Sequence, residues 1–334
     1  MMRDYVPIHG RLPFRFGHAL LSAVGLVLLW ISLVQAAHAQ SYPQEPIRLV
    51  IGFGQGGPTD VAARVVADKL TEELGQQVFV ENRPGASGNI ATQTVAEAPA
   101  DGYSYLIGAL PLAVNHSRFP EFPVKFGRDI MAIAAIGATN NVLVVHPDVE
   151  ADTVEEFGAL ARSEPDTLSC GTFGKGSSSH LGMAEFETRA NVDLLEVPYK
   201  SNSDTVNDIL GGHISCWFAP VPSVAALVEA GKLRALAATG PERVDALPEV
   251  PTFAELGYNG FDVRLWTGLF GRADVPADRL DVIEQASARV LATDEMKAAL
   301  IKQGLVPMEM DRTGFTDFVN AEIERWSAIG RQLN

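Results

Sequence analysis

The turn that decides the fold of this chain reads GFGQGGPTD over residues 52–60. An apolar run over residues 47–51 leads into it and predicts a strand, and apolar residues at helical spacing from Val61 to Leu74 lead out of it. A glycine-rich turn between a strand and a helix leaves backbone N–H groups unpaired, and the positive end of the helix dipole adds to them. The sequence therefore predicts an anion-binding site at this turn.

The glycine spacing in this turn also fits a dinucleotide-binding loop. Gly52, Gly54 and Gly57 follow the pattern G-x-G-x-x-G, and Glu81 ends the next apolar run, where an acid would bind a ribose. Against a nucleotide stand Pro58 at the start of the helix and the proline-containing loop directly after Glu81. An NAD-dependent enzyme is therefore kept only as a remote alternative.

Composition and charge restrict the class of partner. The chain has 334 residues, of which 47% are hydrophobic and 20% are charged, which is typical of a soluble globular protein with room for two domains. Its net charge of -15 argues against nucleic acid or an anionic membrane as the partner. An acidic chain that binds an anion must therefore use local dipoles and a few well-placed donors.

The N-terminus has the pattern of a secretory signal peptide over residues 1–39. Arg11 and Arg15 form a basic flank, the stretch from Ala19 to Val34 is largely apolar and uncharged, and residues 37–39 read Ala-His-Ala, a small-x-small cleavage site. The apolar stretch is shorter than the roughly 20 residues of a membrane span, which favours cleavage over an uncleaved anchor. We expect an exported, periplasmic protein.

Strand and helix patterns alternate in two series along the chain. The first series runs over residues 46–107 and the second over residues 153–238, with two strands expected between them at 133–137 and 142–145. Three closing helices are expected at residues 276–293, 294–303 and 313–333. The expected fold is therefore α/β, with two similar lobes, each a doubly wound, mainly parallel sheet. Ligands in such sheets bind outside the carboxyl ends of the strands, so the two glycine-rich loops would meet across one cleft.

The second glycine-rich loop reads GTFGKGSSSH over residues 171–180. It does not match the phosphate-loop pattern, which requires glycine at position 169 and serine or threonine at position 176, because the chain has Ser169 and Gly176 there. It also contains no G-x-S-x-G nucleophile elbow. Adjacent serine and histidine side chains at a helix start diverge around the axis, which is poor geometry for a proton relay. We interpret the loop as hydroxyl and backbone donors that cap a helix and bind an anion. Lys175 either adds a positive charge to them or is a solvated loop lysine.

Other chemistry has little support in the sequence. The seven histidines are scattered, and neither H-x-x-x-H nor C-x-x-C occurs, so we expect no metal and no cofactor. Asp60, directly after the first loop, has two interpretations. It either compensates the dipole of the helix or accepts a hydrogen bond from a ligand or a bound water.

The two cysteines, Cys170 and Cys216, both fall on predicted core strands. The simpler interpretation is two buried thiols. In an oxidising compartment they could instead form a disulfide. The sequence leaves both possibilities open.

Short motifs in a fixed order connect the chain to a known family. They include YP (42–43), PIR (46–48), VENRPGA (80–86), DGY (101–103), SSHL (178–181), VPYK (197–200), LGG (210–212), GKLRALA (231–237) and LPEVPT (247–252). With these motifs the chain resembles the Bug-type, TctC-like solute receptors of tripartite tricarboxylate transporters, from about residue 42 to residue 331. Each motif is short, but the ordered set is specific.

The resemblance implies a two-lobed clamp of the type II periplasmic-binding-protein kind that is not an enzyme. Lobe one would comprise residues 40–141 and 265–334, and lobe two residues 142–264. The expected function is capture of a small mono-, di- or tricarboxylate between the lobes by a monomer, and its delivery to integral membrane transporter subunits. A ligand sensor for a signalling partner is the alternative.

The resemblance also implies which residues bind the ligand. The expected residues are Gly56, Gly57, Thr59 and Asp60 from lobe one, and Gly176, Ser177, Ser178 and His180, beside Lys175, from lobe two. The chain departs from the family pattern at Gln55 and Pro58, where relatives carry proline and glycine, and Pro58 removes one N–H donor. It departs again at residues 219–220, Ala-Pro in place of an acid-amide pair. These departures leave the identity of the ligand open.

Overall fold

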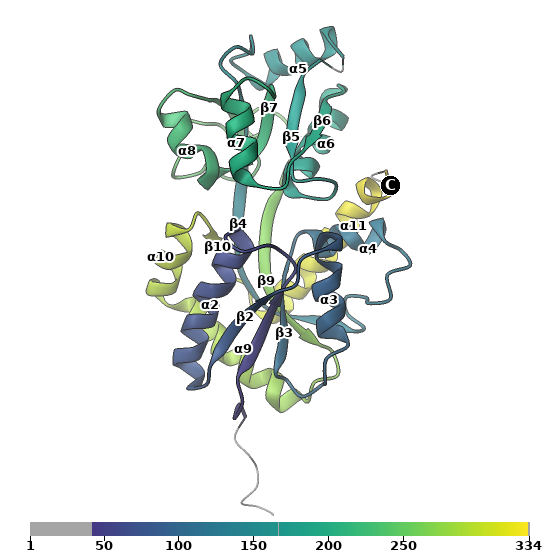
Figure 1. Cartoon of the computed structure of the whole chain (residues 1–334), viewed down its shortest axis with the longest axis vertical. Helices are drawn as coiled ribbons and strands as arrows, with labels where there is room; N and C mark the ends of the chain where they lie inside the picture. Colours follow the sequence, from purple (N-terminus) through teal and green to yellow (C-terminus); the bar gives the residue numbers. More distant parts are fainter. Residues whose placement is uncertain (1–41, 166, 333–334) are drawn as a thin grey trace, which may run out of the picture. The chain divides into compact units, whose positions relative to one another are not determined.

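The computed structural model describes residues 42–165 and 167–332. The described residues from Glu45 onward belong to one unit (Figure 1). The predicted signal peptide, residues 1–39, lies outside the described residues. Among the helices that are described, none has the length and apolar character needed to cross a membrane.

One sheet organises the described part of the chain, and strand β4 (Ile130–Val145) belongs to two segments of it. Segment A has the strand order β2-β1-β3-β9-β4, with β10 also paired to β4; segment B has the order β8-β4-β7-β5-β6. The other strands are β1 (Ile47–Ile51), β2 (Val78–Asn82), β3 (Ser104–Ala109), β5 (Ser169–Thr172), β6 (Leu195–Pro198), β7 (Cys216–Pro220), β8 (Arg234–Ala238), β9 (Arg264–Arg272) and β10 (Val306–Pro307).

Helices pack on both segments (Figure 1). Those associated with segment A are α2 (Pro58–Leu74), α3 (Asn89–Ala96), α4 (Pro111–Arg118), α9 (Ala277–Ala292), α10 (Asp294–Lys302) and α11 (Arg312–Gln332), together with the short 3-10 helix η1 (Ala86–Gly88). Those associated with segment B are α5 (Val154–Ser163), α6 (Ser178–Ala190), α7 (Asn202–Leu210) and α8 (Val221–Glu229). The chain is thus α/β throughout, as the sequence predicts.

Strand directions bring the carboxyl ends of both parallel sets to the same stretch of β4. In segment A, β1, β2 and β3 are parallel. The last residue of β3, Ala109, pairs with Thr267 near the start of β9, and the first residue of β9, Arg264, pairs with Asn140 of β4. In segment B, β5, β6 and β7 are parallel, and the last residue of β7, Pro220, pairs with Asn141 of β4. We call residues 139–141 the junction. The loops that follow β1 and β5 therefore start from strand ends at the junction, where ligands bind in open α/β sheets.

Strand β4 corrects one expectation from the sequence. Two strands, at 133–137 and 142–145, were expected, but one 16-residue strand covers both. The polar residues Thr139, Asn140 and Asn141 interrupt the apolar pattern, which is why the sequence indicates a break. The backbone nevertheless stays extended, because Thr139 and Asn140 pair with β9 and Asn141 pairs with β7.

Helix α4 and strand β9 were not expected either. Helix α4 lies in a proline-containing stretch that the sequence indicates to be irregular, but Pro111 occupies the first helical turn, where its missing N–H costs nothing. Strand β9 is buried along most of its length between β3 and β4, so its sequence lacks the alternation of a half-exposed strand. Both elements lie next to the junction.

The start of α5 agrees with its prediction. The hydroxyl of Thr153 accepts a hydrogen bond from the Glu156 amide at 3.1 Å, and the Glu156 carboxylate accepts one from the Thr153 amide at 3.1 Å. This reciprocal pair is a capping box, and it fixes where the second α/β series begins, at residue 153 as the sequence predicts.

The cysteines are buried free thiols, which confirms the simpler of the two interpretations. Cys170 of β5 and Cys216 of β7 lie directly opposite each other on neighbouring parallel strands. Burial, followed by the hydrogen bond with Cys170, raises the pKa of the Cys216 thiol well above its ordinary value. Both side chains therefore act as small apolar core residues.

Candidate functional site

The first glycine-rich loop joins β1 to α2 and is organised around a buried carboxylate. Asp60 is only 2% exposed. Its Oδ2 accepts hydrogen bonds from the Gly56 amide at 2.9 Å and from Arg64 Nε at 3.0 Å, and its Oδ1 accepts from Arg64 Nη2 at 3.0 Å and from Asn82 Nδ2 at 2.9 Å. These four donors match the roughly four acceptor sites of a carboxylate. Asp60 therefore holds the loop in shape, and its direct contact with a ligand stays a prediction.

The ionisation of Asp60 follows from this network. Burial is the largest single influence and would raise its pKa, but the hydrogen bonds from Arg64, Gly56 and Asn82 together lower it below the ordinary value of 3.8. The charged form is therefore the one that the loop is built to bind. Of the other predicted residues here, Thr59 is buried, Gly57 caps the helix and Gly56 is exposed with a φ of 78°.

A second turn, which the sequence does not single out as a site, lies against the first loop. Residues 85–88 all have positive φ, including the non-glycine residues Ala86 at 47° and Ser87 at 53°. Such a run costs backbone free energy, and it persists because helix α4 holds it: Asn115 Nδ2 donates to the Ser87 carbonyl at 2.9 Å. A side chain at Gly52 would collide with the backbone of Gly88, so glycine at 52 permits this close approach.

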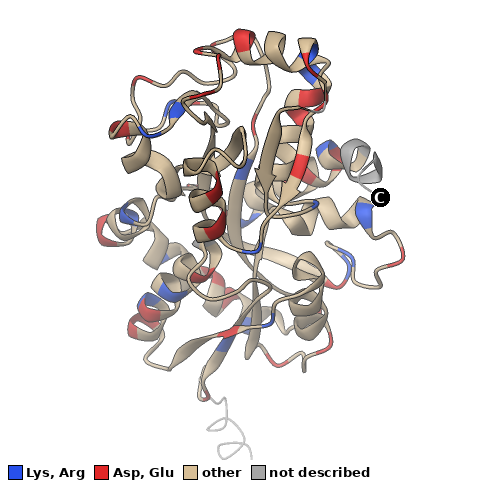
Figure 2. Cartoon of the chain, turned by 45° about the horizontal axis from the view of Figure 1, so that its top comes forward, with Lys and Arg blue, Asp and Glu red and all other residues tan. Residues whose placement is uncertain are grey.

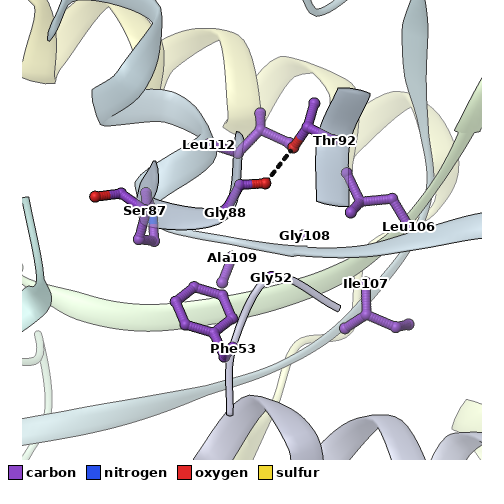
Figure 3. A pocket seen from close by; sticks show the side chains of 11 residues that line it. Gly52, Phe53, Ser87, Gly88, Thr92, Leu106, Ile107, Gly108, Ala109 and Leu112 are labelled. Atoms are coloured by element: carbon purple, nitrogen blue, oxygen red, sulfur yellow. Dashed lines mark hydrogen bonds between the residues drawn. The ribbon is translucent and has the colours of Figure 1, made fainter. Parts of the chain in front are cut away.

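A small cavity lies among the first loop, this turn and the end of β3 (Figure 3). Its volume is about 10 Å³, close to the smallest space that holds one water molecule. Figure 3 shows Phe53, Ser87 and Ala109 around it, with the Thr92 hydroxyl donating to the Gly88 carbonyl at 3.1 Å. The first loop and the turn are thus closely packed rather than separated by a ligand-sized hollow.

The second glycine-rich loop is organised by hydroxyl groups instead of a carboxylate. Ser177 caps α6, and its Oγ accepts from the His180 amide at 3.3 Å. Ser179 Oγ accepts from the Phe173 amide at 3.0 Å, and Thr172 Oγ1 accepts from the Gly174 amide at 3.0 Å. The helix begins at Ser178, because the serine cap acts at 177.

The other predicted residues of this loop differ in exposure. Ser178 and Gly176 are buried, whereas Lys175 is exposed. Gly176 has a φ of 84°, a conformation that side chains with a Cβ rarely adopt. A glycine at this position therefore fits the observed turn.

His180 is buried in the first turn of α6 beside a carboxylate. Its Nε2 lies 3.8 Å from Glu196 Oε2, and Glu196 Oε1 accepts from the Thr172 hydroxyl at 2.7 Å. Burial, the largest influence, lowers the pKa of His180, and the nearby Glu196 opposes this. A neutral imidazole whose Nε2 carries the proton toward Glu196 leaves Nδ1 as an acceptor. This Nδ1 is buried and has no hydrogen-bond partner among the described residues.

Arg118, at the end of α4, connects the turn to the second loop. Its Nη1 donates to the Lys175 carbonyl at 2.6 Å and to the Ser87 hydroxyl at 3.2 Å. Burial lowers its pKa and Glu196 raises it, but an arginine stays charged at any physiological pH. The sequence does not reveal Arg118, because the helix that carries it was not expected. It is a fixed positive charge between elements of segments A and B.

Buried polar atoms without a hydrogen-bond partner gather around the junction. Within the described part of the chain these atoms belong to Asn115 and Arg118 of α4, Thr139, Asn140 and Asn141 of β4, His180 of α6, Asn202 of α7, Trp217 of β7 and Ser287 of α9. All but Trp217 and Ser287 lie on β4 itself or near the strand ends that meet there. Buried polar groups are normally paired, so this concentration indicates a binding region.

Charge is spread over the molecule. Figure 2 shows acidic residues on elements of both sheet segments, with lysine and arginine among them. No group of three or more His, Cys, Asp or Glu side chains within the described ranges has the geometry to hold a metal ion. The loop amides, the positive ends of α2 and α6 and the Arg118 guanidinium are features of the described site that attract an anion.

Comparison with known proteins gives the family. The family model described as "Tripartite tricarboxylate transporter family receptor" matches residues 62–334. The chain belongs to the TctC family. The TctC family consists of receptors, so the prediction that the chain is not an enzyme is confirmed, and the NAD-dependent alternative is set aside. Glu81, its ribose-binding candidate, is paired with Arg48 at 3.0 Å.

Relatives support the family and the fold. The chain is 31% identical to Protein BugT of Bordetella pertussis over 315 residues, which is 94% of this chain and 97% of BugT. A structure described as a periplasmic transporter is 31% identical, with a TM-score of 0.78, and the match covers 88% of this chain and 99% of that one. The periplasmic-binding-protein fold predicted from the sequence is therefore confirmed.

Two related structures contain carboxylates. R. palustris Rpa4515 with adipate is 29% identical, with a TM-score of 0.76, over 87% of this chain and 98% of that one. MatC from Rhodopseudomonas palustris with bound malate is 26% identical, with a TM-score of 0.76, over 86% of this chain and 100% of that one. Two structures similar to this chain thus contain a bound carboxylate.

Proposed function

We propose that this TctC receptor is a periplasmic protein that binds a small carboxylate between two lobes and delivers it to membrane transporter subunits. Lobe one would comprise residues 40–141 and 265–334, and lobe two residues 142–264. The observation that carries the proposal is that two glycine-rich loops open helices α2 and α6 from strand ends that meet at the junction. Each loop supplies N–H donors and a positive helix end, which suit a carboxylate.

The nine predicted binding residues divide by role in this proposal. Backbone donors come from Gly57 and Gly176, and hydroxyl groups come from Thr59 and Ser178. The Gly56 and Ser177 amides shape their loops instead, because they donate to Asp60 and to the Gly174 carbonyl. Asp60 shapes the first loop, and His180 and Lys175 flank the second. Arg118 adds the charge that balances the carboxylate, because the Lys175 carbonyl and the Ser87 hydroxyl hold its guanidinium in place.

Ligand screening tests the binding part of the proposal. The mature protein, residues 40–334, is screened by thermal shift and isothermal titration against mono-, di- and tricarboxylates, with neutral alcohols of the same carbon skeletons as controls. At least one carboxylate should raise the melting temperature in proportion to ln(1 + [L]/Kd), and the alcohols should not. If only ligands without a carboxylate stabilise the protein, the proposal is wrong.

A serine variant tests the site itself. Ser178→Ala should weaken binding of that carboxylate by about 1–3 kcal/mol, because a buried hydroxyl beside the helix N-terminus is lost. Ser163→Ala is the matched control, since Ser163 is an exposed serine at the end of α5. Equal affinities of the two variants would remove Ser178 from the site. Uptake of the labelled carboxylate by cells that lack or carry the receptor tests delivery.

A further inference from the structure

We propose that Asn141 recognises a neutral hydrogen-bonding group on the ligand, so that the preferred ligand is a carboxylate that also carries a hydroxyl or an amide. The inference rests on the proposed carboxylate site and adds the chemistry of the other end of the ligand. It assigns a specificity role to the junction, which the two glycine-rich loops do not supply.

The position of Asn141 follows from the alternation of side chains along β4. Leu143 belongs to the core cluster that contains Phe218, so Asn141, two residues earlier, lies on the same face of the sheet. Helix α6 covers this face, because a Cβ on Gly182 would lie 2.8 Å from the Phe218 ring. Ser178 is one helical turn before Gly182, toward the carboxyl end of β5. The first turn of α6 and Asn141 therefore share one face at the level of the junction.

The side chain of Asn141 is buried without any partner. The residue is 0% exposed, and neither Oδ1 nor Nδ2 has a hydrogen-bond partner among the described residues. Its backbone, in contrast, is fully paired: the amide donates to Thr239 Oγ1 at 3.1 Å and the carbonyl accepts from the Thr239 amide at 2.9 Å. The strand thus fixes the backbone of Asn141, while its side-chain amide is left without a hydrogen-bond partner among the described residues. A buried, unpaired amide opposes folding, so it points to a partner from outside the chain.

The unpaired atoms of Asn141 define the chemistry of that partner. Asn141 offers the acceptor Oδ1 and the donor Nδ2. A hydroxyl or an amide both donates and accepts, and so can satisfy this set. A second carboxylate carries acceptors only and would leave Oδ1 unpaired. The arrangement therefore favours a hydroxy- or amido-carboxylate over a simple dicarboxylate.

Matched ligands test this preference directly. Dicarboxylates such as succinate are compared with their monoamides, such as succinamate, over a series of chain lengths by isothermal titration. The wild-type protein should bind the best monoamide at least about tenfold more tightly than its dicarboxylate. Asn141→Leu, which keeps the volume and removes the amide, should abolish this ratio while still binding a carboxylate.

Stability without ligand separates recognition from a structural role. Because Asn141→Leu removes an unpaired polar group from the interior, the ligand-free variant should melt at a higher temperature than the wild type. Ser287→Ala is the matched control: Ser287 on α9 is also buried and unpartnered in the described chain, but lies away from the junction, so the ligand ratio should not change. A lower melting temperature for Asn141→Leu with all ligands weakened equally would overturn the proposal.

The outcomes distinguish this inference from the proposed function. If the wild type binds no carboxylate at all, the proposed function itself is wrong. If it binds carboxylates but shows no preference for the monoamide, or if Asn141→Leu keeps the preference, only the role of Asn141 is wrong.

Discussion

The two glycine-rich loops solve the same structural problem with different chemistry. In the first loop one buried carboxylate, Asp60, accepts four hydrogen bonds and ties the turn to Arg64 and Asn82. In the second loop three hydroxyls share the task, and no charged side chain takes part in these bonds. A helix N-terminus needs its backbone donors organised, and either a charge or a set of neutral caps can do this.

The difference concerns what each loop is attached to. The bonds of Asp60 stay within segment A, so they make the first loop rigid on its own. The second loop is bonded through the Lys175 carbonyl to Arg118 of α4, which belongs to segment A. We therefore expect substitutions in the first loop to act mainly on stability, and substitutions around the second loop to act mainly on binding.

Asp60→Ala should have the largest effect on stability, and it tests whether Asp60 organises the first loop. Removal of a buried carboxylate that has four donors leaves them unpaired, and should lower the free energy of unfolding by roughly 2–4 kcal/mol in urea denaturation. Glu72→Ala is the control: this glutamate of the same helix is exposed and pairs with Lys69, so its loss should cost about 0.5 kcal/mol or less. Equal effects of the two variants would show that Asp60 does not organise the loop.

Acid titration sharpens the same result. Because the pKa of Asp60 is lowered in the folded state, its contribution to stability is complete above the ordinary value of 3.8 and is lost as the pH falls through the folded-state pKa. Asp60→Asn lacks this contribution, so the stability difference between wild type and variant should be constant near neutral pH and should shrink below about pH 4.

Arg118→Ala should have the next largest effect and addresses the second half of the comparison. It removes the hydrogen bonds to the Lys175 carbonyl and the Ser87 hydroxyl, so affinity for the carboxylate should fall roughly tenfold or more, with a faster dissociation rate. Arg128→Ala is a matched control, since Arg128 pairs with its neighbour Asp129 at the surface. A large loss of stability with unchanged affinity would contradict the division of roles.

His180→Gln should have the smallest effect on stability, which should be seen as a change in its pH dependence. Burial lowers the pKa of His180, so the unfolded chain binds a proton more readily, and stability should decline as the pH falls below 6.5 toward the folded-state pKa. The glutamine variant should lose this part of the decline when denaturation is followed between about pH 7 and pH 5. An unchanged pH profile would show that His180 does not titrate in this way.

The sequence predicts the α/β class, both loops and most helices, because these depend on local signals. These signals act on residues close to them in the sequence: they are the glycine-rich turns, the capping box at Thr153 and the helical spacing after residue 60. For the same reason the sequence points to Ser177 and Gly176, whose roles as a helix cap and a left-handed turn are local.

The rest of the candidate site depends on pairing between distant residues. Arg118 matters because its helix ends opposite Lys175, and Asn141 matters because β9 and β7 hold a polar stretch extended. Single-sequence periodicity indicates a loop for Thr139-Asn140-Asn141, since three polar residues interrupt an apolar run. The hydrogen bond from Asn82 to Asp60 could not be foreseen either, because the two residues lie on different elements.

The path of β4 also sets an order for assembly of the chain. The residues between β4 and β9 supply the other strands of segment B without a break, so that segment can pair its strands as soon as they exist. Segment A cannot do so, because β9 pairs with β3 and β4 only after the whole intervening region has been made. Contacts of such long sequence separation form slowly. Strand β3 therefore lacks its partner β9 on one edge until the chain has been made as far as Arg272.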